Sequence, residues 1–116
     1  MIKRGDIILI KFPFTDLTSA KVRPALVVSS DQYNCVSNDA IFMLITSKIS
    51  NSFMEDFLVD SGHPEFSVTG LRMPSLFKID RIVILSKAIA AKKLGEAGPQ
   101  IMNEISLRLK KVLAIP

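Results

Sequence analysis

Apolar residues in this chain fall into short runs of the length of a β-strand. The run "DIILIKF", Asp6–Phe12, is apolar at both alternating sets of positions, which indicates a strand that is covered on both faces. Pro13 ends this strand, because proline has no N–H group to donate to a neighbouring strand. The longest run without a charge, Ala40–Ser47, is also of strand length and far shorter than the roughly 18 residues of a membrane helix.

The first two-thirds of the chain continues as strands separated by turn-forming residues. We predict further strands at Ala25–Ser30, Ala40–Ser47 and Met54–Asp60. "SLFKID" and "RIVILSKAIA", residues 75–90, add one or two more. The segments "DQYNCVSND", residues 31–39, and "SGHPEFSVTG", residues 61–70, are predicted to be turns.

The last part of the chain is predicted to be one amphipathic helix. Gly98-Pro99 is typical of a helix start, because proline fits the first helical position. Apolar residues then recur at helical spacing: Ile101, Met102, Ile105, Leu109, Val112 and Leu113. We therefore expect a mainly β protein, a single domain over residues 1–116, in which about five to seven strands form a small bent sheet or barrel with a C-terminal helix.

Charge and reactive side chains narrow the possible functions. The net charge of +4 and the pI of about 9.4 favour a polyanionic partner or an acidic protein partner. The single cysteine, Cys35, and the single histidine, His63, predict no metal site and no Cys–His catalytic pair. The N-terminus "MIKRGD" leads directly into a strand without the apolar region of a signal peptide, so we expect a cytoplasmic protein without a membrane segment.

Antiparallel pairing of the first three strands would bring one set of strand ends together. The end of the first strand and the end of the third would both lie beside Arg23, and a plain hairpin register sets Arg23 opposite Ser47. The residues predicted to gather at this rim are Phe14, Thr15, Lys21, Arg23, Thr46, Ser47 and Lys48. A guanidinium, ammonium groups, hydroxyls and an aromatic ring could hold the phosphate and bases of single-stranded RNA. The alternative is an ordinary solvated strand end with turn-forming hydroxyl residues.

Four segments, in order, resemble the MazF/PemK family of toxin endoribonucleases. "RGDIILIKFPFTDL" is similar to the family's first strand and loop, and "KVRPALVVSS" to its Arg-Pro-led second strand. "FMLITSKI" is similar to the third strand, and "GLRMPSLFKIDRIVILSKAIAAKKLGEAG" to the closing segment. One departure is Arg72, in a stretch where many members have "GLPxxS" or a close variant.

The resemblance implies an SH3-like barrel that forms a two-fold dimer. It also implies sequence-specific cleavage of single-stranded RNA without a metal or other cofactor, and inhibition by a cognate acidic antitoxin. The family's catalytic arginine falls on Arg23 and its catalytic threonine on Thr46, with Ser47 in a substrate-binding position. The loop from Phe14 to Val22 is expected to contribute to RNA binding, together with Lys48.

The expected reaction is attack of a ribose 2′-OH on the adjacent phosphate, in which Arg23 and Thr46 stabilise the developing charge. One alternative is a catalytically silent barrel that binds RNA or a protein. Another is a gyrase poison of the CcdB type, whose fold is the same. That type depends on a C-terminal Trp-Gly-Ile, whereas this chain ends in Ala114-Ile115-Pro116 and has no tryptophan.

Overall fold

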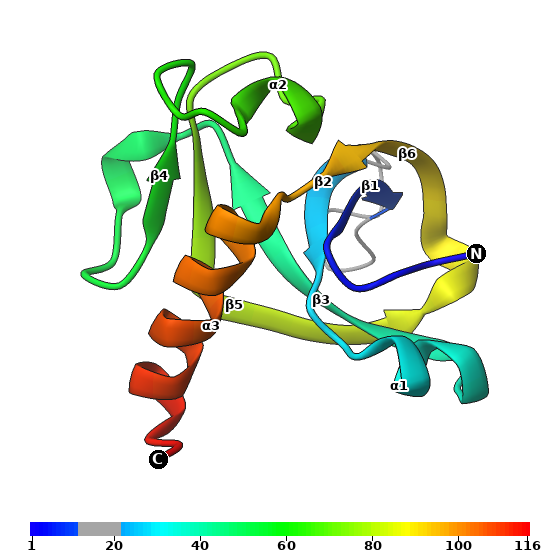
Figure 1. Cartoon of the computed structure of the whole chain (residues 1–116). Helices are drawn as coiled ribbons and strands as arrows, with labels where there is room; N and C mark the ends of the chain where they lie inside the picture. Colours follow the sequence, from blue (N-terminus) through cyan, green and yellow to red (C-terminus); the bar gives the residue numbers. More distant parts are fainter. Residues whose placement is uncertain (12–21) are drawn as a thin grey trace.

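The computed structural model describes residues 1–11 and 22–116. Six strands form one antiparallel sheet in the order β4-β5-β3-β2-β1-β6, and the sheet bends strongly where β1, β2 and β6 curl together (Figure 1). This sheet and its C-terminal helix confirm the prediction of a small, mainly β fold. The strands are β1 (Asp6–Lys11), β2 (Val22–Val27), β3 (Asp39–Thr46), β4 (Phe57–Val59), β5 (Ser75–Ser86) and β6 (Ala90–Glu96).

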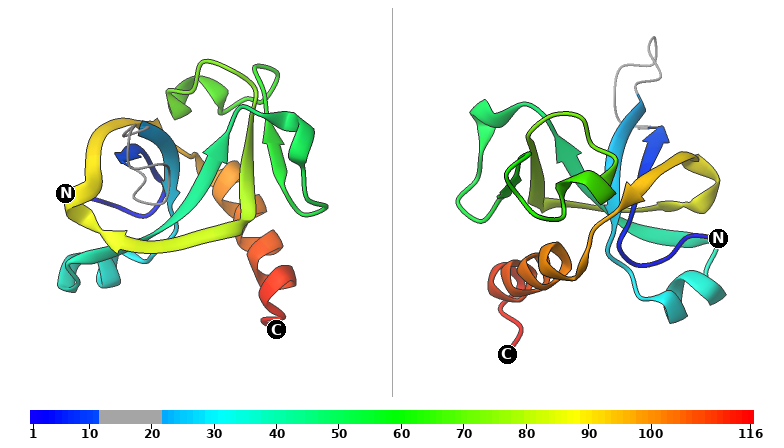
Figure 2. Two further views of the ribbon diagram at one scale, coloured as in Figure 1. Left: turned by 180° about the vertical axis from the view of Figure 1, so that it is seen from behind. Right: turned by 45° about the horizontal axis from the view of Figure 1, so that its top comes forward.

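Each face of the sheet has its own apolar core. On one face Leu26, Met43 and Phe77 pack with Ile101 and Ile105 of the C-terminal helix, α3 (Pro99–Leu113), which lies across the sheet (Figure 2). On the other face the core consists of Ile8, Ile10, Ala25, Val27, Ala40 and Phe42. The first strand contributes to both cores, as its apolar residues at both alternating positions predict.

The C-terminal helix starts where the sequence predicts, after Gly98 and with Pro99 in its first turn. The N–H groups of its first turn have no partner within the helix, and a residue far away in the sequence caps them. The carboxylate of Glu65 accepts hydrogen bonds from the N–H groups of Gln100 and Ile101, both at 2.8 Å. Ile101 and Ile105 are fully buried, whereas Val112 and Leu113 are 38% and 56% exposed. Leu109 also packs against this core, so the contact of the helix with the core extends to its third turn and ends before Val112.

Several predicted boundaries are wrong. The segments around residues 31–39 and 61–70 were expected to be turns but contain short helices, α1 (Asp31–Val36) and α2 (Phe66–Thr69). The second strand begins at Val22 and ends at Val27, earlier than predicted, and the strand expected at Met54–Asp60 is reduced to Phe57–Val59. The last strand, Ala90–Glu96, was not predicted as a strand.

The remaining elements are two 3₁₀ turns, Ile49–Asn51 and Lys87–Ile89. No helix formed by the described residues combines the length and the apolarity that crossing a bilayer requires. Cys35 is an exposed free thiol.

Candidate functional site

Two hollows meet at the ends of β2 and β3. The larger one, here the cationic hollow, has a volume of about 410 Å³ and contains four cationic side chains, Arg23, Lys48, Lys78 and Arg81, together with Thr46. None of the described residues that line it is acidic. A concave surface with several cations and no carboxylate is suited to an anion, because the mutual repulsion of the cations is relieved when the anion binds.

The smaller hollow, here the second hollow, has a volume of about 220 Å³. Arg23, Ile45 and Thr46 line both hollows and so form the ridge between them. The other residues of the second hollow are mostly apolar or hydroxylated: Val22, Pro24, Ser47, Leu71, Arg72, Met73 and Ser75. Among the described residues, the cationic hollow therefore has four cations and two apolar residues, whereas the second hollow has two cations, Arg23 and Arg72, and five apolar residues.

The pairing of β2 with β3 places the two predicted catalytic residues on this ridge. Ala25 lies opposite Leu44, one residue away from the hairpin register predicted above, so the expected pairing of Arg23 with Ser47 is wrong. Extended to the strand ends, the observed register sets Arg23 opposite Thr46. The connection between the strands contains the helix α1, and a plain hairpin register does not apply to it. Because side chains alternate along a strand, this shift puts Thr46, and not Ser47, on the face of Arg23.

An irregularity in the pairing of β3 with β5 brings further cations to the site. Met43 pairs with Ile82 and Ile45 with Phe77, so that the stretch Lys78–Arg81 faces only Leu44. Bulges of this kind redirect side chains and are frequent near active sites. Here the extra residues bring Lys78 and Arg81 into the cationic hollow.

The cations of the hollow are held in different ways. The ammonium of Lys78 lies 2.5 Å from Oδ2 of Asp56, and the side chains of this pair are 11% and 1% exposed. Arg23 is half-buried, whereas Lys48 and Arg81 are exposed. No hydrogen bond or ion pair joins the side chain of any of these three residues to another described residue. Among its described lining residues, the cationic hollow thus has one fixed cation and three that an anion could engage directly.

The hydroxyl of Thr46 is fixed by the turn that follows it. The N–H of Lys48 donates a hydrogen bond to Thr46 Oγ1 at 3.1 Å. Because this contact uses an acceptor position of the oxygen, the hydroxyl proton can be donated elsewhere. Thr46 is half-buried on the ridge, so its donor is accessible to a ligand that enters either hollow.

The structure brings together some of the residues predicted for the site. Arg23, Thr46 and Lys48 share the cationic hollow, and Ser47 lines the second hollow. Phe14, Thr15 and Lys21 lie outside the described residues. Lys78 and Arg81 were missed, because regular alternation along residues 75–86 gives no sign of the irregular pairing that turns them toward Arg23. Within the described ranges, no three His, Cys, Asp or Glu residues gather as a metal site would need.

The sequence profile of a family described as "PemK-like, MazF-like toxin of type II toxin-antitoxin system" matches residues 3–113. This chain belongs to that family. The match includes both hollows and the strands that form them.

Individual members of the MazF-like family support the assignment. "Endoribonuclease MazF6" of Mycobacterium tuberculosis is 32% identical over 97 residues, which cover 81% of this chain and 80% of the relative. "Endoribonuclease MazF2" of Mycobacterium bovis matches to the same extent.

Solved structures share the fold. A MazE-MazF complex from Deinococcus radiodurans superposes with a TM-score of 0.77 at 21% identity, covering 99% of this chain and 97% of that chain. A mycobacterial endoribonuclease in complex with its cognate antitoxin gives a TM-score of 0.75 at 22% identity, covering 100% and 98% of the two chains. At these identities the structures establish the shared MazF-like fold.

Proposed function

We propose that this MazF-like chain is an endoribonuclease toxin that cleaves single-stranded RNA, and that the cationic hollow holds the phosphate to be cleaved. The observation that carries this proposal is the ridge formed by Arg23 and Thr46 beside a hollow with three further cations and no acidic residue among its described lining. The endoribonuclease names of relatives that are 32% identical support the same activity.

The nucleophile is supplied by the RNA. The 2′-oxygen attacks the adjacent phosphorus, the bond from phosphorus to the 5′-oxygen breaks, and the products are a cyclic 2′,3′-phosphate and a 5′-OH end. The 2′-OH proton is released and the leaving 5′-oxygen takes up a proton, so the reaction is balanced without a metal or another cofactor. The protein then has to hold the phosphodiester and stabilise the charge that develops on it.

Arg23 and Thr46 are suited to this stabilisation. A guanidinium donates two parallel hydrogen bonds to phosphate oxygens, and it remains charged throughout the pH range in which proteins function. The hydroxyl of Thr46 adds a neutral donor on the same ridge. Arg81 increases the positive potential of the hollow, and Lys78 adds less to it because its ammonium is paired with Asp56. Lys48 and Ser47 extend the binding surface along the end of β3.

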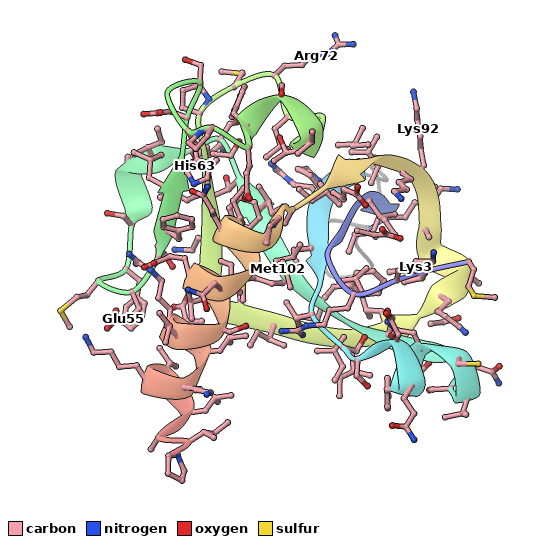
Figure 3. All side chains as sticks on the ribbon, viewed as in Figure 1. Lys3, Glu55, His63, Arg72, Lys92 and Met102 are labelled. Atoms are coloured by element: carbon pink, nitrogen blue, oxygen red, sulfur yellow. The ribbon has the colours of Figure 1, made fainter. Side chains whose placement is uncertain are left out.

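No histidine is among the described residues that line either hollow. His63 lies before α2, on the α3 side of the sheet, where its Nδ1 accepts a hydrogen bond from the N–H of Glu65 (Figure 3). A pair of histidines, the usual means of moving protons in RNA cleavage near neutral pH, is therefore not part of the proposed site. Electrostatic stabilisation carries most of the catalysis, and we expect a modest turnover number.

The proposed partners follow from the charge of the site and from the family. A cognate antitoxin would inhibit by laying an acidic segment over the cationic hollow, where it excludes RNA. The proposed active form is a cytoplasmic homodimer in which RNA crosses the two-fold interface. Native mass spectrometry at micromolar concentration checks this state, and a monomer there would contradict the dimer.

The test is cleavage of single-stranded RNA by purified protein in excess EDTA. Cleavage should proceed, and Arg23→Ala should slow it by about 100-fold or more, as removal of one preorganised donor does elsewhere. Thr46→Val should also slow it, while Lys110→Ala, at an exposed position near the end of α3, serves as the control for a lost surface charge. Binding without cleavage by the unchanged protein would contradict the enzyme and favour a silent RNA-binding barrel.

A further inference from the structure

Arg72 is a cation on the rim of the second hollow that the proposed chemistry does not use. It lines this hollow but not the cationic one, and its guanidinium extends from the 71–74 segment into solvent (Figure 3). No hydrogen bond or ion pair connects its side chain to another described residue. The N–H donors of an exposed arginine without an intramolecular partner are available to hydrogen-bond a ligand.

The segment that carries Arg72 is anchored at both ends. Before it, Gly70 has a φ of 74°, and a Cβ there would collide with the carbonyl group of Leu94 in β6, so the chain packs directly against that strand. After it, the buried Ser75 donates a hydrogen bond from Oγ to the carbonyl oxygen of Met73 at 2.8 Å. The backbone under Arg72 is thus held in place, which recognition of a particular ligand edge requires.

The described lining of the second hollow has more apolar residues and fewer cations than that of the cationic hollow, which suits a nucleobase. Val22, Pro24, Leu71 and Met73 supply apolar surface, on which the flat face of a base can lie. Beyond the ridge, the polar side chains of the described lining are those of Ser47, Arg72 and Ser75. The Ser75 hydroxyl is bonded to Met73, which leaves Ser47 and Arg72 to meet a base edge, and the Arg72 side chain has to turn inward from solvent to do so. A volume of about 220 Å³ leaves room for one base.

The position of this hollow ties it to the cleaved bond. Its ridge, Arg23 and Thr46, is also the wall of the cationic hollow. A phosphate held on that ridge would leave the base of one of its two flanking nucleotides beside Arg72.

We propose that the second hollow binds the base next to the cleaved phosphate and that Arg72 selects guanine there. This inference rests on the proposed RNA-cleaving function. Guanine presents two adjacent acceptors, O6 and N7, which match the two parallel donors of a guanidinium. Adenine turns an amino donor toward the same fork, and the two carbonyl acceptors of uracil are separated by N3–H. Cytosine offers an adjacent acceptor pair, O2 and N3, only on its Watson–Crick edge, so enrichment of cytosine in place of guanine would overturn the assignment. A matched pair of this kind discriminates by about ten-fold or more.

The experiment maps cleavage ends on a pool of random single-stranded RNA for three proteins. The unchanged protein should show guanine enriched at one of the two positions that flank the cut. Arg72→Met removes the fork but keeps a long side chain, and this enrichment should fall by about ten-fold, toward equal use of the four bases. Arg81→Met is the matched control: it removes a cation from the cationic hollow, and should slow cleavage of all sequences with the guanine enrichment retained.

A second measurement tests whether Arg72 contacts N7 of the guanine. In a defined substrate with guanine at the enriched position, replacement by 7-deazaguanine removes the N7 acceptor. This replacement should slow the unchanged protein and should have little effect on Arg72→Met.

The outcomes separate the inference from the function on which it rests. If the unchanged protein cleaves no RNA, the proposed function fails. If it cleaves without guanine enrichment, the function stands and Arg72 selects no guanine. If Arg72→Met lowers cleavage of all sequences equally and keeps the enrichment, the function stands and Arg72 is a general phosphate contact. Either of these last two results overturns the guanine assignment.

Discussion

Asp56 fixes the ammonium of Lys78 beneath the cationic hollow, with 2.5 Å between Oδ2 and Nζ. The carboxylate also accepts hydrogen bonds from the N–H groups of Phe53, at 2.7 Å, and of Ile79, at 3.2 Å. Arg108 of α3 donates to the carbonyl oxygens of Glu55 and Asp56, both at 2.9 Å, and Figure 3 shows Glu55 beside that helix. The C-terminal helix therefore supports one cation of the proposed site through the Asp56 segment.

Asp56→Ala should destabilise the fold strongly. Lys78 would remain in a largely buried position, near other cations, without its short ion pair to Asp56, and the N–H groups of Phe53 and Ile79 would lose their acceptor. Removal of one partner from a buried ion pair typically costs about 3–5 kcal/mol, and we expect a loss near the lower end of this range. Chemical denaturation measures the free energy of unfolding.

The matched control for Asp56 is Asp80→Ala. Asp80 also faces Lys78, but at 3.9 Å and with its side chain 38% exposed. Exposed ion pairs contribute at most about 1 kcal/mol, so Asp80→Ala should be nearly neutral for stability. Equal losses for the two variants would show that the buried pair is not a special support of the hollow.

Lys48 should contribute to RNA binding through charge alone. It is exposed, lines the cationic hollow, and its side chain has no ion pair with a described residue. Lys48→Ala should weaken the affinity for single-stranded RNA about equally for all sequences, and should reduce the slope of log K against log salt by about 0.7 to 1 unit. The same is expected of Lys21→Ala, at a position outside the described residues.

The measurement for Lys48 is a binding titration with short RNAs at several salt concentrations. Lys110→Ala, on the exposed side of α3, removes the same charge away from both hollows and should leave the slope unchanged. An unchanged slope for Lys48→Ala would remove this lysine from the RNA-binding surface.

That Arg23 and Thr46 lie at one rim of the sheet could be predicted from the sequence, because the shared rim depends on topology alone. Antiparallel neighbours bring the start of β2 to the end of β3 whatever the register, and a slip of one residue changed only which of two adjacent hydroxyls shares the face of Arg23. Lys78 and Arg81 could not be found in this way. Their orientation depends on an irregular pairing of β3 with β5, which is set by the packing of a whole sheet.

Tertiary contacts also explain the elements that were missed. Ala90–Glu96 carries Lys92 and Lys93 and has little of the apolar pattern of a strand, yet it is a strand because it pairs with β1 at the edge of the sheet. The segment 31–39 is rich in residues favoured in turns, and yet it contains a helix. The side chain of Ser30 caps this helix by accepting a hydrogen bond from the N–H of Tyr33. That cap is visible in the sequence only when the helix is already known.

Glu65→Ala should destabilise the protein by removing the cap of α3. Both carboxylate oxygens accept N–H groups from the first turn of that helix, from a position far away in the sequence, and a carboxylate is favoured there by the helix dipole. Loss of a capping side chain costs about 1–2 kcal/mol. Glu104→Ala is the control, since it removes a glutamate paired with Arg108 on the surface of the same helix and should cost less. Thermal denaturation of both variants measures the loss of stability, and a larger loss for Glu104→Ala than for Glu65→Ala would contradict the capping role of Glu65.

Gly70→Ala should disturb both stability and the proposed guanine preference. Its φ of 74° disfavours any side chain, and the new Cβ would collide with the backbone carbonyl of Leu94, so either β6 or the segment that carries Arg72 has to move. We expect a loss of at least about 1 kcal/mol in the free energy of unfolding. Gly62→Ala is the matched control, because Gly62 is exposed and the contact closest to its Cβ is the side chain of Asp60. If Gly70→Ala folds with reduced stability but retains the full guanine enrichment in cleavage mapping, the position of Arg72 does not depend on this anchor.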